Sequence, residues 1–134
     1  MDWLDCKNKG FVKESKVDNN LVNSLIKSSE KKSESNKRLG LDETTASTKV
    51  SLAYEALREV LEALAIKKGF KIYNHDCFSA FLDEICKNKS FSAEFDKFRR
   101  LRNQINYYGK DISVEEAKII IKEINLLRIK LLEK

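Results

Sequence analysis

The chain of 134 residues contains no proline and only four glycines, and this scarcity of helix-breaking residues limits the folds open to it. Apolar residues recur at i, i+3, i+4 and i+7, and no segment sustains an alternation of apolar and polar residues. The sequence therefore predicts an all-α protein, an antiparallel bundle of about five helices. Because a hydrophobic content of 42% suffices for a core, we expect one domain over residues 1–134, in which residues 1–17 form a leader packed on the bundle.

Capping residues and glycines set the expected helix boundaries. The first helix is expected from Asp18 to about Arg38, and the second from Asp42 to about Lys68. A connector, Phe70 to Asn74, leads to a third helix that begins at His75. The fourth is expected from about Ser92 to Tyr107 or Tyr108, and the fifth begins with a capping box at Ser113. The second helix carries a continuous apolar stripe and should be central. The polar second half of the first helix predicts either a solvated extension or a close contact with another helix.

Charge and cysteine content indicate which binding partners and which cellular compartment to expect. A net charge of +5 and a pI near 9.0 favour anionic partners. The segment from Lys87 to Gly109 has six basic and two acidic residues, hence a charge of +4. Without an apolar run of roughly 18 residues or a signal peptide, we expect a cytoplasmic protein with no membrane contact. The spacing of the cysteines matches no zinc motif, so we expect reduced thiols, no metal and no cofactor.

The fourth helix places a charged residue on its apolar face. At about 100° per residue, its buried arc contains Phe95, Phe98, Leu101, Ile105 and Tyr108. Arg102 falls inside this arc, where an unpaired guanidinium would be costly. Three environments would satisfy Arg102: solvent reached along the arc, a polar cleft that holds a phosphate or a nucleotide, or a carboxylate of the second helix such as Glu55, Glu59 or Glu62.

The segment from Arg99 to Gly109, RRLRNQINYYG, resembles the signature of the HEPN superfamily, the higher eukaryote and prokaryote nucleotide-binding domains. The family pattern is an arginine, a polar residue that is often asparagine, and a histidine four to six positions after the arginine. Arg102 and Asn103 match its first two positions. The helix order is also similar, with the segment YEALREVLEALAIKKGFK in a long second helix and a histidine at the start of the third. Where the family has its histidine, this chain has Tyr107.

The resemblance implies a homodimer that binds RNA or a nucleotide in a cleft lined by Arg102, Asn103, Asn106 and Tyr107. The further binding residues that we expect there are Arg99, Arg100 and Tyr108. Active members of the family are metal-independent endoribonucleases, many from toxin–antitoxin pairs, in which the arginine and the histidine promote attack by the ribose 2′-hydroxyl. With Arg102 and Tyr107 as the catalytic pair, full activity is not expected, because tyrosine has an unperturbed pKa of about 10 and is a poor base at neutral pH.

Several alternatives stay open at this stage. The chain could be an inactive HEPN-like partner of a nucleotidyltransferase, which would modify Tyr107 or Tyr108, or a structural bundle in which Arg102 pairs with a glutamate. His75, the only histidine, is expected to pack or cap at a helix end, and it can replace the missing motif histidine only if the fold brings it to Arg102. The acidic face of the second helix is expected to be solvated or salt-bridged rather than a metal site.

Overall fold

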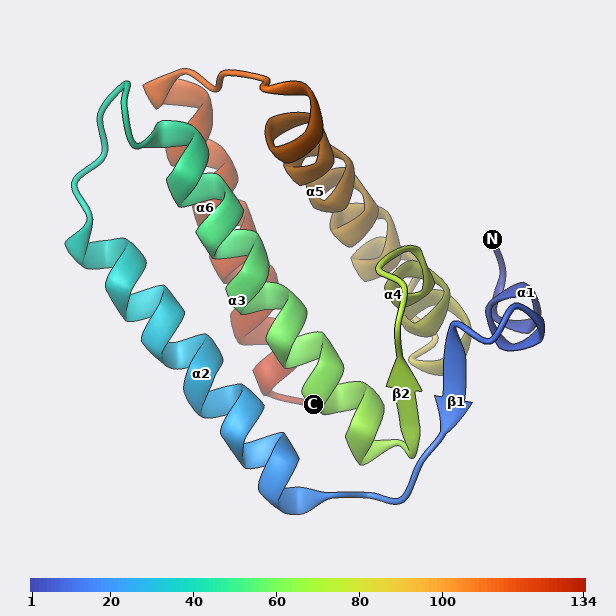
Figure 1. The fold of residues 1–134 in the computed structure, drawn as a ribbon. Coiled ribbons are helices and arrows are strands. Elements are labelled where there is room, and N and C mark those ends of the chain that lie inside the picture. The colour runs from blue at the N-terminus through green and yellow to red at the C-terminus, as the bar shows by residue number, and fades with distance from the viewer.

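A computed structural model describes all 134 residues, and long helices make up most of it (Figure 1). In chain order the elements are α1 (Trp3–Asn8), β1 (Val12–Glu14), α2 (Asn19–Arg38), α3 (Ala46–Lys67), β2 (Phe70–Ile72), α4 (Asp76–Ala80), the π-helical turn η1 (Phe81–Ile85), α5 (Lys89–Tyr108) and α6 (Val114–Leu132). The helices α2, α3, α5 and α6 lie alongside one another, and the short elements gather where α5 begins (Figure 1). The prediction of an all-α helical bundle is confirmed.

Helix α3 is the central helix, as its apolar stripe predicted. It contacts α2, α5 and α6, and most of its residues are buried. Its side chains Tyr54, Leu57 and Leu61 are fully buried in the main core. This core is completed by aromatic rings of α4, η1 and α5, namely Phe78, Phe81, Phe95 and Phe98. One face of α5 is therefore held against α3, and Arg102 belongs to that face.

Most helix ends follow from the expected caps. The Asp18 carboxylate accepts a hydrogen bond from the Leu21 amide at 3.0 Å, and Gly109, with φ of +65°, ends α5. The Ser113 hydroxyl caps α6 without the reciprocal half of a capping box. Asp42 lies before α3 rather than at its cap, because its carboxylate accepts from the amides of Thr44 and Thr45 in a turn and the helix begins only at Ala46.

The leader and the connector pair as a small antiparallel sheet, which the sequence did not predict. Val12 lies opposite Ile72, and Glu14 lies opposite Phe70. Strands of three residues are too short to show an alternating pattern, and each finds its hydrogen-bonding partner far away in the chain. The leader does pack on the bundle, and the pairing fixes the connector just before His75.

Cys6 and Cys77 form a disulfide, so the expectation of reduced thiols is wrong for these two residues. Their Cα atoms are 6.0 Å apart, within the usual range for a disulfide, and both side chains are fully buried. No local pattern in the sequence indicates this pairing, because the cysteines are 71 positions apart and meet only when α1 packs on α4. Cys86 is free and partly buried.

The polar second half of α2 is a close helix contact rather than a solvated extension. The buried Ser29 hydroxyl donates to the Ala56 carbonyl of α3 at 2.6 Å and accepts from Nε of Arg128 at 2.8 Å. The buried Asn36 amide donates to the Lys49 carbonyl at 3.1 Å. Small polar side chains at these positions let the two helices approach while their polar atoms find partners.

Helix α5 differs from its prediction at both ends. It begins at Lys89, three residues before the expected Ser92, because the Asn88 side chain caps it by accepting from the Phe91 amide at 3.0 Å. At its other end, Tyr108 was expected in the buried arc but is 84% exposed. The smaller core cluster beneath this part of α5 extends only as far as Ile105, so the last turn has no surface to pack against.

Candidate functional site

Arg102 is buried in the fold, and its guanidinium meets polar groups from three helices. Only 8% of its side chain is exposed. Its Nη2 atom lies 2.7 Å from Nδ1 of His75, at the start of α4. Its Nη1 atom donates to Oδ1 of Asn103 at 3.2 Å and to the Tyr107 hydroxyl at 3.4 Å. Arg102, the charged residue on an apolar helix face, is thus the centre of a cluster that also contains His75, Asn103, Tyr107 and, from α3, Tyr54.

His75 packs at a helix end, which is one of the two roles expected of it, and it does not cap the helix. It occupies the N-cap position of α4, but its side chain makes no capping hydrogen bond. Its Nδ1 atom faces Arg102 and also lies 3.0 Å from the Tyr54 hydroxyl. A guanidinium can only donate hydrogen bonds, so Nδ1 must accept, and the proton of the neutral ring is on Nε2. The ring therefore offers an N–H donor on the side away from Arg102.

The environment keeps His75 neutral. Burial, together with the positive charges of Arg102 and Arg58, lowers its pKa to about 4. At neutral pH the ring is uncharged, as the accepting Nδ1 atom requires. An anion placed beside Nε2 would favour the protonated form and raise this pKa, so the ring responds electrostatically to a negatively charged ligand.

The low pKa of His75 predicts a loss of stability in mild acid. Between about pH 6.5 and pH 4, histidine in the unfolded chain binds a proton that folded His75 does not, so acid favours unfolding across this window. Because the ring is only half-buried and solvent screens its charge, we expect a loss of roughly 1–2 kcal/mol in the free energy of unfolding. Urea unfolding at about pH 7 and about pH 4.5 measures it. The matched variant His75→Gln should lose less stability over the same interval, and an equal loss would contradict the assignment.

Tyr54 of α3 contacts both Arg102 and His75. The Arg102 guanidinium lies over its ring at 4.8 Å from the centroid, which is a cation–π contact. Its hydroxyl faces Nδ1 of His75, and burial raises the pKa of Tyr54, so the hydroxyl stays protonated. Tyr54 therefore holds the guanidinium and the imidazole in place from below.

The carboxylates nearby leave part of the Arg102 charge unpaired. Glu55, one of its three predicted partners, approaches Nη2 only to 3.8 Å, and it lies 2.9 Å from Arg58. Glu62 also pairs with Arg58, and Glu59 pairs with Lys32, so this acidic face is salt-bridged as expected. The Nε atom of Arg102 is buried and has no hydrogen-bond partner. The Nε–H donor of the guanidinium is therefore free.

The structure separates the other predicted site residues into two groups. Asn103 and Tyr107 contact Arg102 directly. The other four do not: Asn106 accepts from Ser51, Tyr108 is exposed, Arg99 pairs with Asp76 and Asp96, and Arg100 pairs with Asp96. Arg99 has a positioning role, because its ion pair with Asp76 ties α5 to the residue that follows His75.

Two residues of the cluster were not predicted as site residues. Tyr54 was assigned to the core from its place in the apolar stripe, and its hydroxyl is the part that the stripe pattern does not describe. His75 was expected at a helix end. The available signal was its position as the only histidine, at the start of the third helix. The sequence could not show that α4 begins beside the middle of α5.

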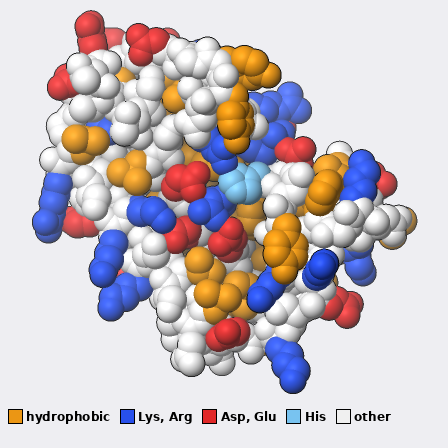
Figure 2. All heavy atoms as spheres, viewed as in Figure 1, with side chains coloured by type: hydrophobic (Ala, Val, Ile, Leu, Met, Phe, Trp, Pro, Cys, Tyr) orange, Lys and Arg blue, Asp and Glu red, His pale blue; other side chains and the backbone are white.

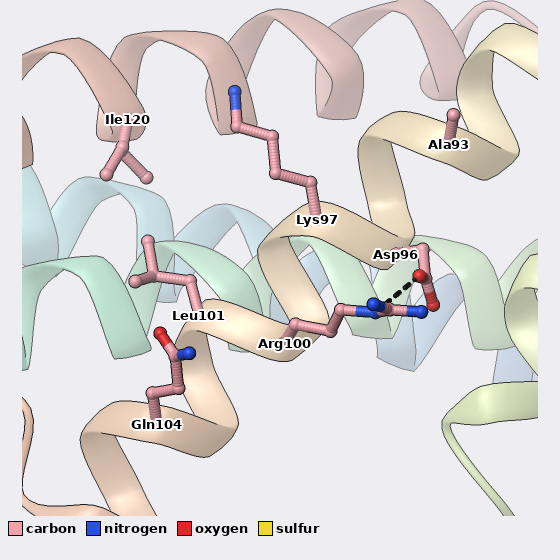
Figure 3. A pocket seen from close by; sticks show the side chains of 7 residues that line it. All are labelled: Ala93, Asp96, Lys97, Arg100, Leu101, Gln104 and Ile120. Carbon is pink, nitrogen blue, oxygen red and sulfur yellow. Dashed lines mark ion pairs between the residues drawn. The ribbon is translucent and has the colours of Figure 1, made fainter.

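The cluster reaches the molecular surface at His75. Figure 2 shows the histidine on the exposed face, among Lys or Arg and Asp or Glu side chains. A separate surface pocket between α5 and α6 contains Arg100, paired with Asp96, and has Leu101 and Ile120 among its other lining residues (Figure 3). Neither Arg102 nor His75 lines that pocket, so it is a different surface from the cluster.

The structure brings no group of three His, Cys, Asp or Glu side chains into a metal-binding arrangement. No helix combines the length and the apolar character that crossing a bilayer requires. Comparisons with protein-family models, with curated proteins and with solved structures found no match to this chain.

Proposed function

We propose that this protein is a HEPN-like domain that binds RNA or a nucleotide through Arg102 and His75. The observation that carries the proposal is the buried guanidinium of Arg102, which has an unpartnered Nε atom and lies 2.7 Å from a neutral histidine. Arginine binds phosphate with its planar array of donors, and the Nε2–H group of His75 offers a further donor on the side of the ring away from Arg102. Asn103 and Tyr107 complete the polar lining.

The position of His75 supports the resemblance, because the fold brings it to Arg102, the condition under which it could replace the missing motif histidine. The family signature places its histidine after the arginine on the same helix, where this chain has Tyr107. Here the imidazole comes from the start of α4 and contacts the same guanidinium. An arginine and a histidine are thus paired within one chain, although the histidine does not occupy the position that the signature gives it.

The hydrogen bonds of His75 favour binding over cleavage. A general base must accept a proton, yet Nδ1 already accepts from Arg102 and Nε2 carries the ring proton. A pKa of about 4 also makes the ring a weak base. Ribonuclease activity would require the ring to change its tautomer, so we propose that the site binds RNA rather than cleaves it efficiently. Any cleavage measured in EDTA, which removes metal ions, should be slow and should depend on His75.

Binding of RNA should depend on salt. Each phosphate contact releases counterions, so two contacts, by Arg102 and one neighbouring basic residue, should give a slope of about −1.4 in a plot of log affinity against log salt concentration. Fluorescence polarisation with labelled single-stranded RNA measures this slope. Absence of binding at low salt, or binding that ignores salt, would contradict the proposal.

A second function is favoured by the exposure of two tyrosines. Tyr107 is 70% exposed and Tyr108 is 84% exposed, so both side chains can be reached by a modifying enzyme, and only the Tyr107 hydroxyl is engaged by Arg102. In this alternative the chain is an inactive HEPN-like partner of a cognate nucleotidyltransferase in a toxin–antitoxin pair. Mass spectrometry after incubation with that enzyme and ATP would find a nucleotidyl group on Tyr107 or Tyr108, and an unmodified protein would contradict it.

A homodimer belongs to the same proposal. The outer face of α6 exposes three apolar side chains at heptad-like spacing, Ile119, Leu126 and Ile129, and these support association of two copies. The Arg102 cluster lies within one chain, so a partner subunit would extend the cleft rather than complete it. Light scattering of the purified protein gives the oligomeric state.

A further inference from the structure

An apolar groove lies on the same side of α3 as the Arg102 cluster. It is formed by the start of α2, the end of α3 and β2, and its apolar lining is Leu21, Leu25, Ile66, Ile72 and Tyr73. Its volume is about 230 Å³. Because a cavity of about 150 Å³ can hold benzene, the groove has room for an aromatic ring system. Tyr73, one of these lining residues, is 61% exposed.

A row of charged residues on α3 connects the groove with Arg102. Glu55 lies beside Arg102, Arg58 pairs with both Glu55 and Glu62, and Glu62 lines the groove. Seven residues of helix separate Glu55 from Glu62, about 10 Å along the axis. Tyr73 also precedes His75 by only two residues. Figure 2 shows this face, with charged side chains around the histidine and a hydrophobic patch below it.

A second aromatic surface lies close to Arg102. The Tyr107 hydroxyl is 3.4 Å from Nη1 of Arg102, while most of its ring is exposed. A ligand bound at Arg102 could therefore contact two aromatic surfaces. One is the ring of Tyr107 on α5, and the other is the groove that contains Tyr73. Unpaired bases stack on exposed aromatic rings with little dependence on sequence.

We propose that the ligand is single-stranded RNA, bound with one phosphodiester at Arg102 and His75, one base on Tyr107 and another in the groove beside Tyr73. This inference rests on the proposed function and deepens it. A mononucleotide has one base and would occupy only one of the two surfaces. A duplex keeps its bases paired and stacked inside, so neither surface could be used. The arrangement selects an unpaired strand.

The substitution Tyr73→Leu tests the groove. It removes the ring, and we expect it to weaken binding of a labelled single-stranded RNA by about tenfold, while Tyr73→Phe, which keeps the ring, stays close to wild type. Because Tyr73 is exposed, both variants should keep the helical content seen by circular dichroism. Leu4→Ala is a control for a surface substitution away from the groove, because Leu4 of α1 is 62% exposed and does not line the groove. Unlabelled mononucleotide and duplex RNA should compete poorly.

The outcomes separate this inference from the proposed function. If wild type binds single-stranded RNA and Tyr73→Leu binds equally well, the groove has no part in binding and the inference is overturned, while the proposed function stands. Equal competition by mononucleotide would overturn it in the same way. If wild type does not bind single-stranded RNA at any salt concentration, the proposed function itself fails.

Discussion

Replacing Arg102 by glutamine is expected to weaken the binding of single-stranded RNA by about a hundredfold at low salt. The substitution removes the planar donor array and the buried positive charge beside His75, while the glutamine amide can still donate a hydrogen bond within the cluster. Fluorescence polarisation measures the loss. Arg102→Lys should recover little of it, because an ammonium group keeps the charge but not the fork.

Arg100→Gln is the matched control for the Arg102 variants. It lies on the same helix, its side chain is 73% exposed, and its ion pair is with Asp96. Salt screens an exposed charge of this kind, so we expect a change in RNA affinity of less than about threefold. Circular dichroism should show equal helicity in all variants. Wild-type affinity of Arg102→Gln, or an equal loss in Arg100→Gln, would refute the central role of Arg102.

Breaking the Cys6–Cys77 disulfide should cause the largest loss of stability. The bond closes a loop of about 71 residues, and restriction of the unfolded chain by such a loop is worth about 4 kcal/mol. Cys6→Ser should therefore lower the free energy of unfolding in urea by about that amount, and reducing agent should have no further effect on the variant. Wild-type protein in reducing agent should resemble the variant.

Cys86→Ser provides the control, because Cys86 is free and only partly buried. We expect it to change the free energy of unfolding by less than about 1 kcal/mol. Thiol labelling of the unreduced protein should count one free cysteine rather than three. Three labelled thiols, or unchanged stability of Cys6→Ser, would show that the bond is absent in solution.

Loss of the disulfide in Cys6→Ser should also loosen α4 and so reduce RNA affinity, since Cys77 follows His75 by two residues.

Local signals predicted the helices well and the contacts between distant segments poorly. Asp18 and Gly109 set helix ends through their own side chain and backbone, so the sequence carried these boundaries directly. The pairing of Val12 with Ile72 and of Cys6 with Cys77 depends on where the leader docks. No periodicity within a single segment contains that information.

The candidate site was predictable only in part, for the same reason. A guanidinium inside an apolar arc identified Arg102, and spacing along one helix identified Asn103 and Tyr107. His75 and Tyr54 enter the cluster from α4 and α3, so their roles depend on helix packing. Arg99 was predicted to bind ligand, yet Asp76 and Asp96 already neutralise it, and neither pairing was expected from the sequence.

The position of Trp3 provides an optical probe of the region that holds the site together. It is the only tryptophan, it is 8% exposed, and its ring packs edge-on against Phe70 at 5.2 Å. Its amide also donates to the carboxylate of Glu84 at 2.6 Å. Tryptophan emission thus reports whether the leader is docked beside α4 and η1, while far-ultraviolet dichroism reports the four long helices. A shift of emission to longer wavelength without loss of dichroism would reveal an opened leader on an intact bundle.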